Sequence, residues 1–80
     1  MGIISEKIEK ELITVVLQSS NLKGAVYNTV TKILTITFNN GSIYEYYDFP
    51  WDVFTKFRLS ESQGKFFNGQ INGKYKYKKV

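Results

Sequence analysis

One polar segment of the chain combines residue types that hold anions: residues 62–65 read Ser-Gln-Gly-Lys. A Ser and a Gly at the start of a helix can turn main-chain N–H groups toward a phosphate, and Lys65 would add a positive charge. The structural alternative is that Ser62 caps the helix and Gly64 allows the turn. The hypothetical phosphate site consists of Ser62, Gln63, Gly64 and Lys65, and Asn68 is a further predicted ligand-binding residue.

Two tyrosines, Tyr44 and Tyr46, lie two residues apart in a run that alternates like a β-strand. Exposed rings could stack nucleobases, which stabilises a complex by about 1–3 kcal/mol per base. Rings on the core-facing side would instead pack inside, with their hydroxyl groups reaching toward the surface. Because the favoured strand register turns both rings inward, the sequence favours core packing, and base stacking is the alternative.

The C-terminal tail is basic. Lys74 and Lys76 alternate with Tyr75 and Tyr77, and no acidic residue follows Glu61, so the net charge of +4 is concentrated at this end. Such a strand could follow phosphate groups and stack bases. Lysines on an edge strand also prevent edge-to-edge aggregation, which explains the pattern equally well.

The chain lacks the side chains of the common catalytic and metal centres. It has no Cys and no His, and three of its seven carboxylates, Glu6, Glu9 and Glu11, lie near the N-terminus. This excludes thiol nucleophiles, imidazole bases and the usual zinc ligand sets. Ser62 and Lys65 lack a third group that would orient a nucleophile. We therefore expect no enzyme activity, no metal and no cofactor.

Hydrophobic periodicity predicts the elements that position these residues. Ile4, Ile8 and Leu12 recur every four residues among charged side chains, which favours an N-terminal helix over residues 5–12. Pro50 fixes φ and suits the first turn of a later helix. Strands are expected over residues 13–18, 24–28, 32–38, 42–47 and 74–78, and helices over residues 50–59 and 65–70.

The loop at residues 39–41 decides how the central strands pair. A two-residue turn would pair Ile36 with Glu45 and place a carboxylate among core residues, which is costly. A three-residue loop with Gly41 in the left-handed region keeps Glu45 on the solvent side. The predicted pairs are therefore Ile36 with Tyr44 and Leu34 with Tyr46.

Two motifs are the most specific in the chain: Tyr-x-Tyr at residues 44–46 and Ser-x-Gly-x-x-Phe-Asn at residues 62–68. Through them the chain resembles the KTSC family, named after the C-terminal domain of some lysyl-tRNA synthetases, over about residues 15–80. The family also occurs as small free-standing proteins of bacteria and phages, so the resemblance implies RNA or nucleotide binding. We divide the chain into an N-terminal helical extension, residues 1–12, and a KTSC-like domain, residues 13–80. Further matching residues are Asn21, Leu22, Val26, Asn28, Phe38, Gly41, Pro50, Val53, Phe54, Ile71 and Tyr75.

These observations predict an α+β fold: a small, antiparallel, strongly twisted sheet or partly open barrel with two short helices packed on it, plus the N-terminal helix. The N-terminus lacks the apolar region of a secretory signal, and no apolar run has the length of a membrane span, so we expect a cytoplasmic protein without membrane contact. The expected function is non-enzymatic capture of a phosphate-bearing nucleotide, either a small signalling nucleotide or a short RNA. A phage protein that sequesters a nucleotide immune signal is one form of this function.

The alternative function is a protein–protein interaction or dimerisation module. Trp51 follows Pro50 directly and could anchor a partner, cover the helix start or contribute to the ligand site. With Phe49 and the N-terminal helix it would form the partner surface, and the lysines would only increase solubility. Nucleotide capture should weaken steeply with salt, whereas an apolar interface should hardly change. A homo-oligomer is compatible with both functions.

Overall fold

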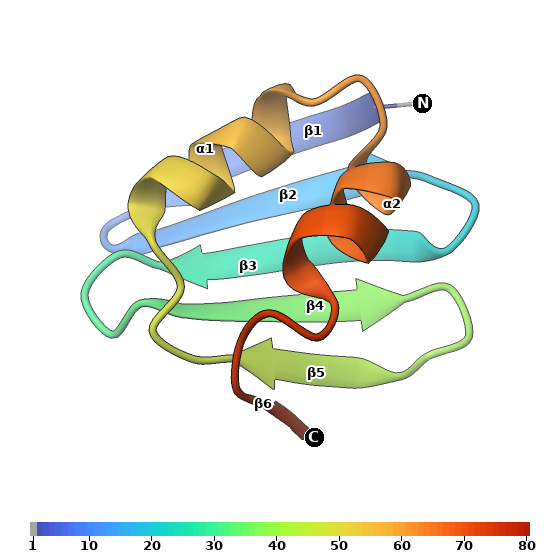
Figure 1. Ribbon diagram of the computed structural model, residues 1–80. Helices are drawn as coiled ribbons and strands as arrows, with labels where there is room; N and C mark the ends of the chain where they lie inside the picture. The colour runs from blue at the N-terminus through green and yellow to red at the C-terminus, as the bar shows by residue number, and fades with distance from the viewer. Residues whose placement is uncertain (1) are drawn as a thin grey trace.

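The computed structural model describes the main chain of residues 2–80 as one open, six-stranded antiparallel sheet with the helices on one face (Figure 1). The strands lie in the sheet in the order in which they occur in the chain, so β1 and β6 form its two edges. The α+β class is confirmed. The elements are β1 (Gly2–Glu9), β2 (Leu12–Gln18), β3 (Leu22–Asn28), β4 (Ile33–Phe38), β5 (Ile43–Tyr46), α1 (Trp51–Leu59), α2 (Gln63–Phe66), η1 (Phe67–Ile71) and β6 (Tyr77–Lys79).

The predicted N-terminal helix is wrong, because residues 2–9 form the edge strand β1. β1 pairs with β2 through a two-residue turn in which Lys10 has a φ of 55°. A spacing of four residues fits two repeats of a strand as well as one turn of a helix, so the periodicity did not discriminate. A helix of eight residues is marginal by itself, whereas β1 gains a ladder of hydrogen bonds from β2. The division into an extension and a domain at residue 12 stays a prediction.

The predicted register of the central strands is confirmed. Ile36 lies opposite Tyr44, and Leu34 lies opposite Tyr46. The loop contains three residues, and Gly41 has a φ of 92°, which favours glycine. The main-chain N–H of Phe38 donates to the carbonyl oxygen of Ser42 at 2.8 Å and closes the loop. This register directs Tyr44 and Tyr46 to the face of the sheet that the helices cover.

The core lies between the sheet and the two helical segments. Phe54 and Phe57 of α1 are completely buried against it, and each contributes roughly 2–3 kcal/mol through burial. Pro50 is the residue that precedes the first turn of α1, close to its predicted place. The predicted second helix is present, but it consists of one α-turn, α2, and one π-turn, η1. The buried core residues are Ile13, Val15, Leu17, Leu22, Ala25, Tyr27, Leu34, Ile36, Tyr46, Phe49, Phe54, Phe57, Phe67 and Ile71.

The final strand is shorter than predicted. Tyr77 belongs to β6 and lies opposite Tyr46, but Tyr75 lies before the strand and packs its ring 4.7 Å from that of Phe49. Lys74 and Lys76 are exposed and also precede β6. A strand over residues 74–78 is therefore wrong in its first half, because Tyr75 leaves the sheet to join the core.

Within residues 2–80, no helix is both long and apolar enough to cross a membrane. The same residues hold no group of three or more acidic side chains that could bind a metal ion.

Candidate ligand pockets

The polar segment of residues 62–65 is occupied by contacts within the protein. Ser62 caps α2, and its Oγ accepts a hydrogen bond from the main-chain N–H of Lys65 at 3.3 Å. Gly64 is buried, and a Cβ atom added there would lie 2.6 Å from Oδ1 of Asn21 and 2.9 Å from Oγ of Ser19. The close approach of α2 to the β2–β3 turn thus leaves little room for a side chain at position 64. These contacts favour the structural alternative for Ser62 and Gly64.

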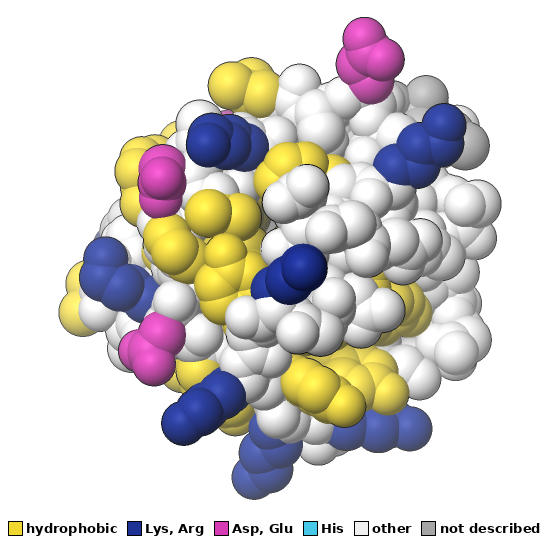
Figure 2. Space-filling view, in the orientation of Figure 1, with side chains coloured by type: hydrophobic (Ala, Val, Ile, Leu, Met, Phe, Trp, Pro, Cys, Tyr) yellow, Lys and Arg dark blue, Asp and Glu magenta, His cyan; other side chains and the backbone are white. Residues whose placement is uncertain are grey.

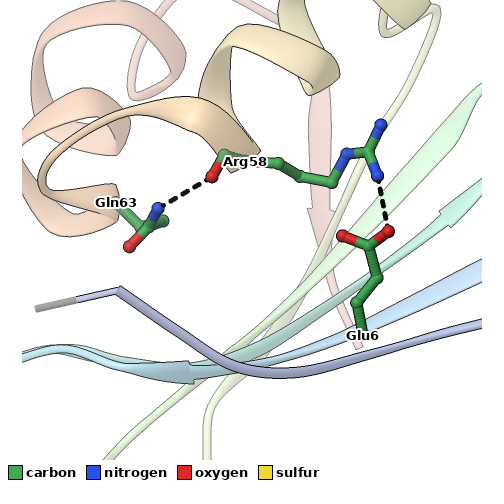
Figure 3. A network of polar contacts seen from close by, with 3 residues as sticks. All are labelled: Glu6, Arg58 and Gln63. Carbon is green, nitrogen blue, oxygen red and sulfur yellow. Dashed lines mark hydrogen bonds and ion pairs between the residues drawn. The ribbon is translucent and has the colours of Figure 1, made fainter.

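Gln63 closes the C-terminal end of α1 (Figure 3). Its side chain is 1% exposed, and its Nε2 donates to the carbonyl oxygens of Ser60 at 3.1 Å and Arg58 at 3.2 Å, with a longer contact of 3.4 Å to that of Phe57. The last carbonyl groups of a helix have no partner inside the helix, and a buried end needs one from elsewhere. Gln63 supplies this partner, so its role is to join α2 to α1.

Trp51 lies beside the ion pair that joins Arg58 of α1 to Glu6 of β1. Arg58 donates to the Glu6 carboxylate on β1 at 2.8 Å (Figure 3), and its guanidinium carbon lies 5.3 Å from the centre of the Trp51 ring. That ring, 46% exposed, also lies 6.1 Å from the ring of Tyr27. Trp51 therefore packs one side of its ring against Tyr27 and Arg58, and the roles suggested for it stay predictions.

A smaller pocket brings together the other candidates. It has a volume of about 370 Å³ and lies between the β4–β5 hairpin, η1 and β6. Tyr44, Tyr46 and Asn68, three of the predicted site residues, line it together. Its complete lining is Phe38, Asn40, Ser42, Tyr44, Tyr46, Phe67, Asn68, Asn72 and Tyr77, and we call it the ring-lined pocket.

The rings of the pocket hold one another in place. Phe38 lies edge-on to Tyr44 with 5.5 Å between ring centres and edge-on to Phe67 at 5.3 Å. Tyr77 lies 5.7 Å from Tyr44 and 5.8 Å from Tyr46. Edge-to-face aromatic pairs contribute about 0.5–1.5 kcal/mol beyond the area that they bury. The walls are therefore preorganised before any ligand enters.

Tyr46 combines a buried ring with an unpaired hydroxyl group. The residue is 3% exposed, and its hydroxyl makes no hydrogen bond to the described side chains, those of residues 6–80, or to the main chain of residues 2–80. Burial raises the pKa of Tyr46 to about 12, with smaller contributions from Tyr44 and Tyr77. The hydroxyl is thus protonated at neutral pH and can donate a hydrogen bond into the pocket that it lines.

Three carboxamides face the same space. Asn40 uses its Oδ1 to accept from the main-chain N–H of Ser42 at 2.9 Å. The side chains of Asn68 and Asn72 make no hydrogen bond to any other residue in the described part of the chain. Each free carboxamide offers two donors and one acceptor, which is the combination that recognises the edge of a nucleobase.

The remaining candidates lie outside this pocket. Ser62 and Lys65 line a larger groove of about 730 Å³ between α1 and the segment α2–η1. Lys74, Lys76 and Trp51 line neither hollow. The predicted single site is therefore divided in two. The lining of the groove is Val53, Lys56, Ser60, Glu61, Ser62, Lys65, Phe66, Gly69, Gln70 and Tyr75.

Sequence reasoning missed several residues of the ring-lined pocket. Asn40 and Asn72 sit in turns, where asparagine is common for conformational reasons, so their types carried no signal. Lys79 does not line the pocket, but it belongs to the basic tail predicted to favour an anionic partner, and the β5–β6 register places it opposite Tyr44. Figure 2 shows hydrophobic side chains at the surface beside the C-terminal strand, with Lys or Arg side chains next to them.

Several known proteins are similar to this chain in sequence or in fold. Lysine–tRNA ligases from Trichormus variabilis and Nostoc punctiforme are 35% and 36% identical over 63 residues, which are 79% of this chain but only 11% of each ligase. A protein from Tsukamurella paurometabola is 34% identical over 59 residues, covering 74% of this chain and 88% of that protein. The crystal structure of a KTSC domain protein from Yersinia pestis matches with a TM-score of 0.79 at 28% identity, over 86% of this chain and 97% of the other. The sequence model of the KTSC domain matches residues 18–75, and the chain therefore belongs to the KTSC domain family.

Proposed function

We propose that this protein is a non-enzymatic module that captures a phosphate-bearing nucleotide, with the base held in the ring-lined pocket. The observation that carries the proposal is the unpaired hydroxyl of Tyr46 in a pocket that also holds the free carboxamides of Asn68 and Asn72. These three groups are accessible from the pocket and unpaired within the chain, so each can form a hydrogen bond to a ligand that enters it.

The size and chemistry of the pocket fit one nucleobase. Ligand pockets measure about 300–1,000 Å³, and a volume of about 370 Å³ lies at the lower end of that range. A base that stacks on an aromatic wall gains about 1–3 kcal/mol, and hydrogen bonds from the carboxamides would select among bases. Tyr44 is partly buried and Tyr77 is 59% exposed, so both rings are accessible walls of the pocket.

The phosphate would lie toward the basic C-terminal end. Lys79 lies opposite Tyr44 across β5 and β6, whereas Lys78 lies opposite Glu45 on the other face of the sheet. In this register, Lys79 is therefore the lysine paired with the Tyr44 ring. The exposed Lys76 precedes the same strand. This assignment moves the phosphate away from residues 62–65, where Ser62 Oγ and Gln63 Nε2 already bond within the protein.

Two ligand classes fit this description. The similarity to part of the lysine–tRNA ligases supports a short RNA, because those proteins act on tRNA. A small signalling nucleotide is the other class, and its capture would lower the free signal, as expected of a phage protein that sequesters a nucleotide immune signal. Both ligands would be met in the cytoplasm, and neither requires catalysis.

Binding can be tested by isothermal titration calorimetry, preceded by a thermal-shift screen with mononucleotides, cyclic dinucleotides, ADP-ribose derivatives and short RNAs. We expect Asn68→Ala to weaken binding of the best ligand about tenfold, and Tyr44→Leu to weaken it about tenfold or more. Lys65→Ala is the control, because Lys65 lines the groove between α1 and the segment α2–η1. This variant should bind the ligand as tightly as the unmodified chain. Affinity should fall steeply with salt.

Two results would contradict the proposal. If no ligand of these classes binds, nucleotide capture is wrong. If Lys65→Ala abolishes binding while Asn68→Ala does not, the ligand occupies the groove between α1 and α2, and the assignment to the ring-lined pocket is wrong.

A further inference from the structure

The edge of the sheet at β1 presents unpaired main-chain groups (Figure 1). The N–H of Thr29 donates to the carbonyl oxygen of Glu11 at 2.9 Å, so odd-numbered residues of β2 direct their main-chain groups toward β3. Ile13 therefore does not bond to Ile8, which lies opposite it in β1. The same alternation applies to Glu6, and the main-chain N–H and C=O groups of Ile8 and Glu6 point outward from the sheet.

Ile8 is an apolar residue on the covered face of the sheet, yet it has no cover. It lies beside Ile13, which is 3% exposed, whereas Ile8 itself is 65% exposed. An isolated exposed apolar residue needs no explanation, but one next to the core on an open sheet edge marks a place where another strand can add.

In an antiparallel pair of two β1 strands, the outward main-chain groups of Glu6 and Ile8 must bond to those of the second copy. Three registers allow this. Pairing Glu6 with its own copy opposes two carboxylates, and pairing Ile8 with Glu6 opposes Lys7 to its own copy. Pairing Ile8 with its own copy opposes Lys7 to Glu9 twice. Opposite charges facing each other stabilise a strand pair and like charges destabilise it, so only the third register is favourable throughout. Within one chain, Lys7 and Glu9 lie on the same face of β1, with Lys7 Nζ 3.9 Å from Glu9 Oε1, and both side chains are exposed.

We propose that β1 is a self-recognition strand, which pairs with β1 of a second copy about a two-fold axis at Ile8 and joins the two sheets. The occupant of the edge is a second copy because the segment Lys7-Ile8-Glu9 is complementary to itself in charge and in apolar contact. The paired segment is short, so the dimer is weak and depends on concentration. The ring-lined pocket lies at the opposite end of the sheet, so this inference is independent of the proposed function.

Sedimentation velocity over a range of concentrations tests the proposal. The unmodified chain should dimerise, and Lys7→Glu and Glu9→Lys should each weaken the dimer about tenfold, because each change opposes like charges twice. The exchanged double variant, Lys7→Glu with Glu9→Lys, should recover the original dissociation constant. An equimolar mixture of the two single variants should form a heterodimer tighter than either variant alone.

Lys23→Glu and Glu61→Lys are the controls, since they change the net charge by the same amounts at exposed positions outside the segment Lys7-Ile8-Glu9. Circular dichroism would verify that all variants are folded. A chain that stays monomeric at every concentration contradicts the proposal. Equal dimerisation of the single variants and the exchanged variant contradicts it as well, because another surface must then form the dimer.

Discussion

Residues 62–65 and the ring-lined pocket are both rich in polar side chains, but their hydrogen-bonding groups have different partners. The amide nitrogen of Gln63 donates to carbonyl oxygens at the end of α1, and Ser62 bonds to the next turn. In the pocket, the hydroxyl of Tyr46 and the carboxamides of Asn68 and Asn72 have no partner among the side chains of residues 6–80 or the main chain of residues 2–80. In the first region the donors bond within the fold and only the buried Oε1 of Gln63 has no partner among the described residues, whereas the second region has donors and acceptors left for a ligand.

The strongest test of this comparison is Gln63→Ala. The substitution leaves buried carbonyl groups at the end of α1 without a donor and opens a cavity, so we expect the free energy of unfolding to fall by about 3 kcal/mol. Urea denaturation measures it. Gln70→Ala, an exposed glutamine in η1, should change stability by less than about 0.5 kcal/mol. If Gln63→Ala and Gln70→Ala lower the free energy of unfolding equally, Gln63 does not have the structural role assigned to it.

The second test uses the pKa of Tyr46, which is about 12 in the folded chain and 10.0 without the fold. Folding favours the protonated phenol, so its stabilising effect is complete below pH 10 and is lost as the pH rises from about 10 to 12. The loss approaches 2 kcal/mol. Urea denaturation at several pH values should show a steeper fall for the unmodified chain than for Tyr46→Phe.

At pH 7, Tyr46→Phe should leave stability within about 0.5 kcal/mol of the original, because the hydroxyl bonds to no described residue. A large loss at pH 7 would mean that this hydroxyl serves the fold rather than a ligand.

Gly64→Ala should have a smaller effect, about 1 kcal/mol, because the new methyl group meets side-chain atoms of Asn21 and Ser19 that can shift. In a double-mutant cycle, Asn21→Ala should relieve part of this loss. If the losses of stability in Gly64→Ala and Asn21→Ala simply add in the double variant, the contact with Asn21 does not limit the size of residue 64.

The smallest expected effect on the fold is that of Asn68→Ala or Asn72→Ala. Both side chains are exposed and bond to no other described residue, so each variant should unfold within about 0.5 kcal/mol of the original chain. Thermal denaturation without ligand measures this. If either variant is clearly destabilised, its carboxamide is part of the fold and the contrast between the two regions fails.

The sequence allowed accurate prediction where one local choice had a clear energetic preference. The β4–β5 register is an example, because the competing register would have paired Glu45 with Ile36 and placed a carboxylate in the core. The N-terminal segment failed because the spacing of Ile4, Ile8 and Leu12 fits both periodicities. The choice there depends on the pairing of β1 with β2, which no local pattern reveals.

The site was harder to predict for a related reason. Residue types at positions 62–65 indicated an anion site, but only the fold shows that Gln63 already bonds to α1. Tyr44, Tyr46 and Asn68 line one pocket together and their ligand-binding role stays a prediction, whereas Asn72 in the same lining was interpreted as a turn residue. Whether a polar group is free depends on distant contacts, and distant contacts are absent from local sequence patterns.

The π-turn η1 has a consequence for how this pocket can evolve. The N–H of Asn72 donates to the carbonyl oxygen of Phe67 at 2.8 Å, five residues back, so the turn holds one residue more than an α-helix would. Asn68 and Asn72 face one hollow, while Gly69 and Gln70 between them face the other. With one residue fewer, the same N–H would lie four residues after the carbonyl of Phe67, which is the α-helical spacing, so the two ends of the turn could stay bonded. The number of residues between the two hollows can therefore change by one while the ends of the turn keep their hydrogen bond.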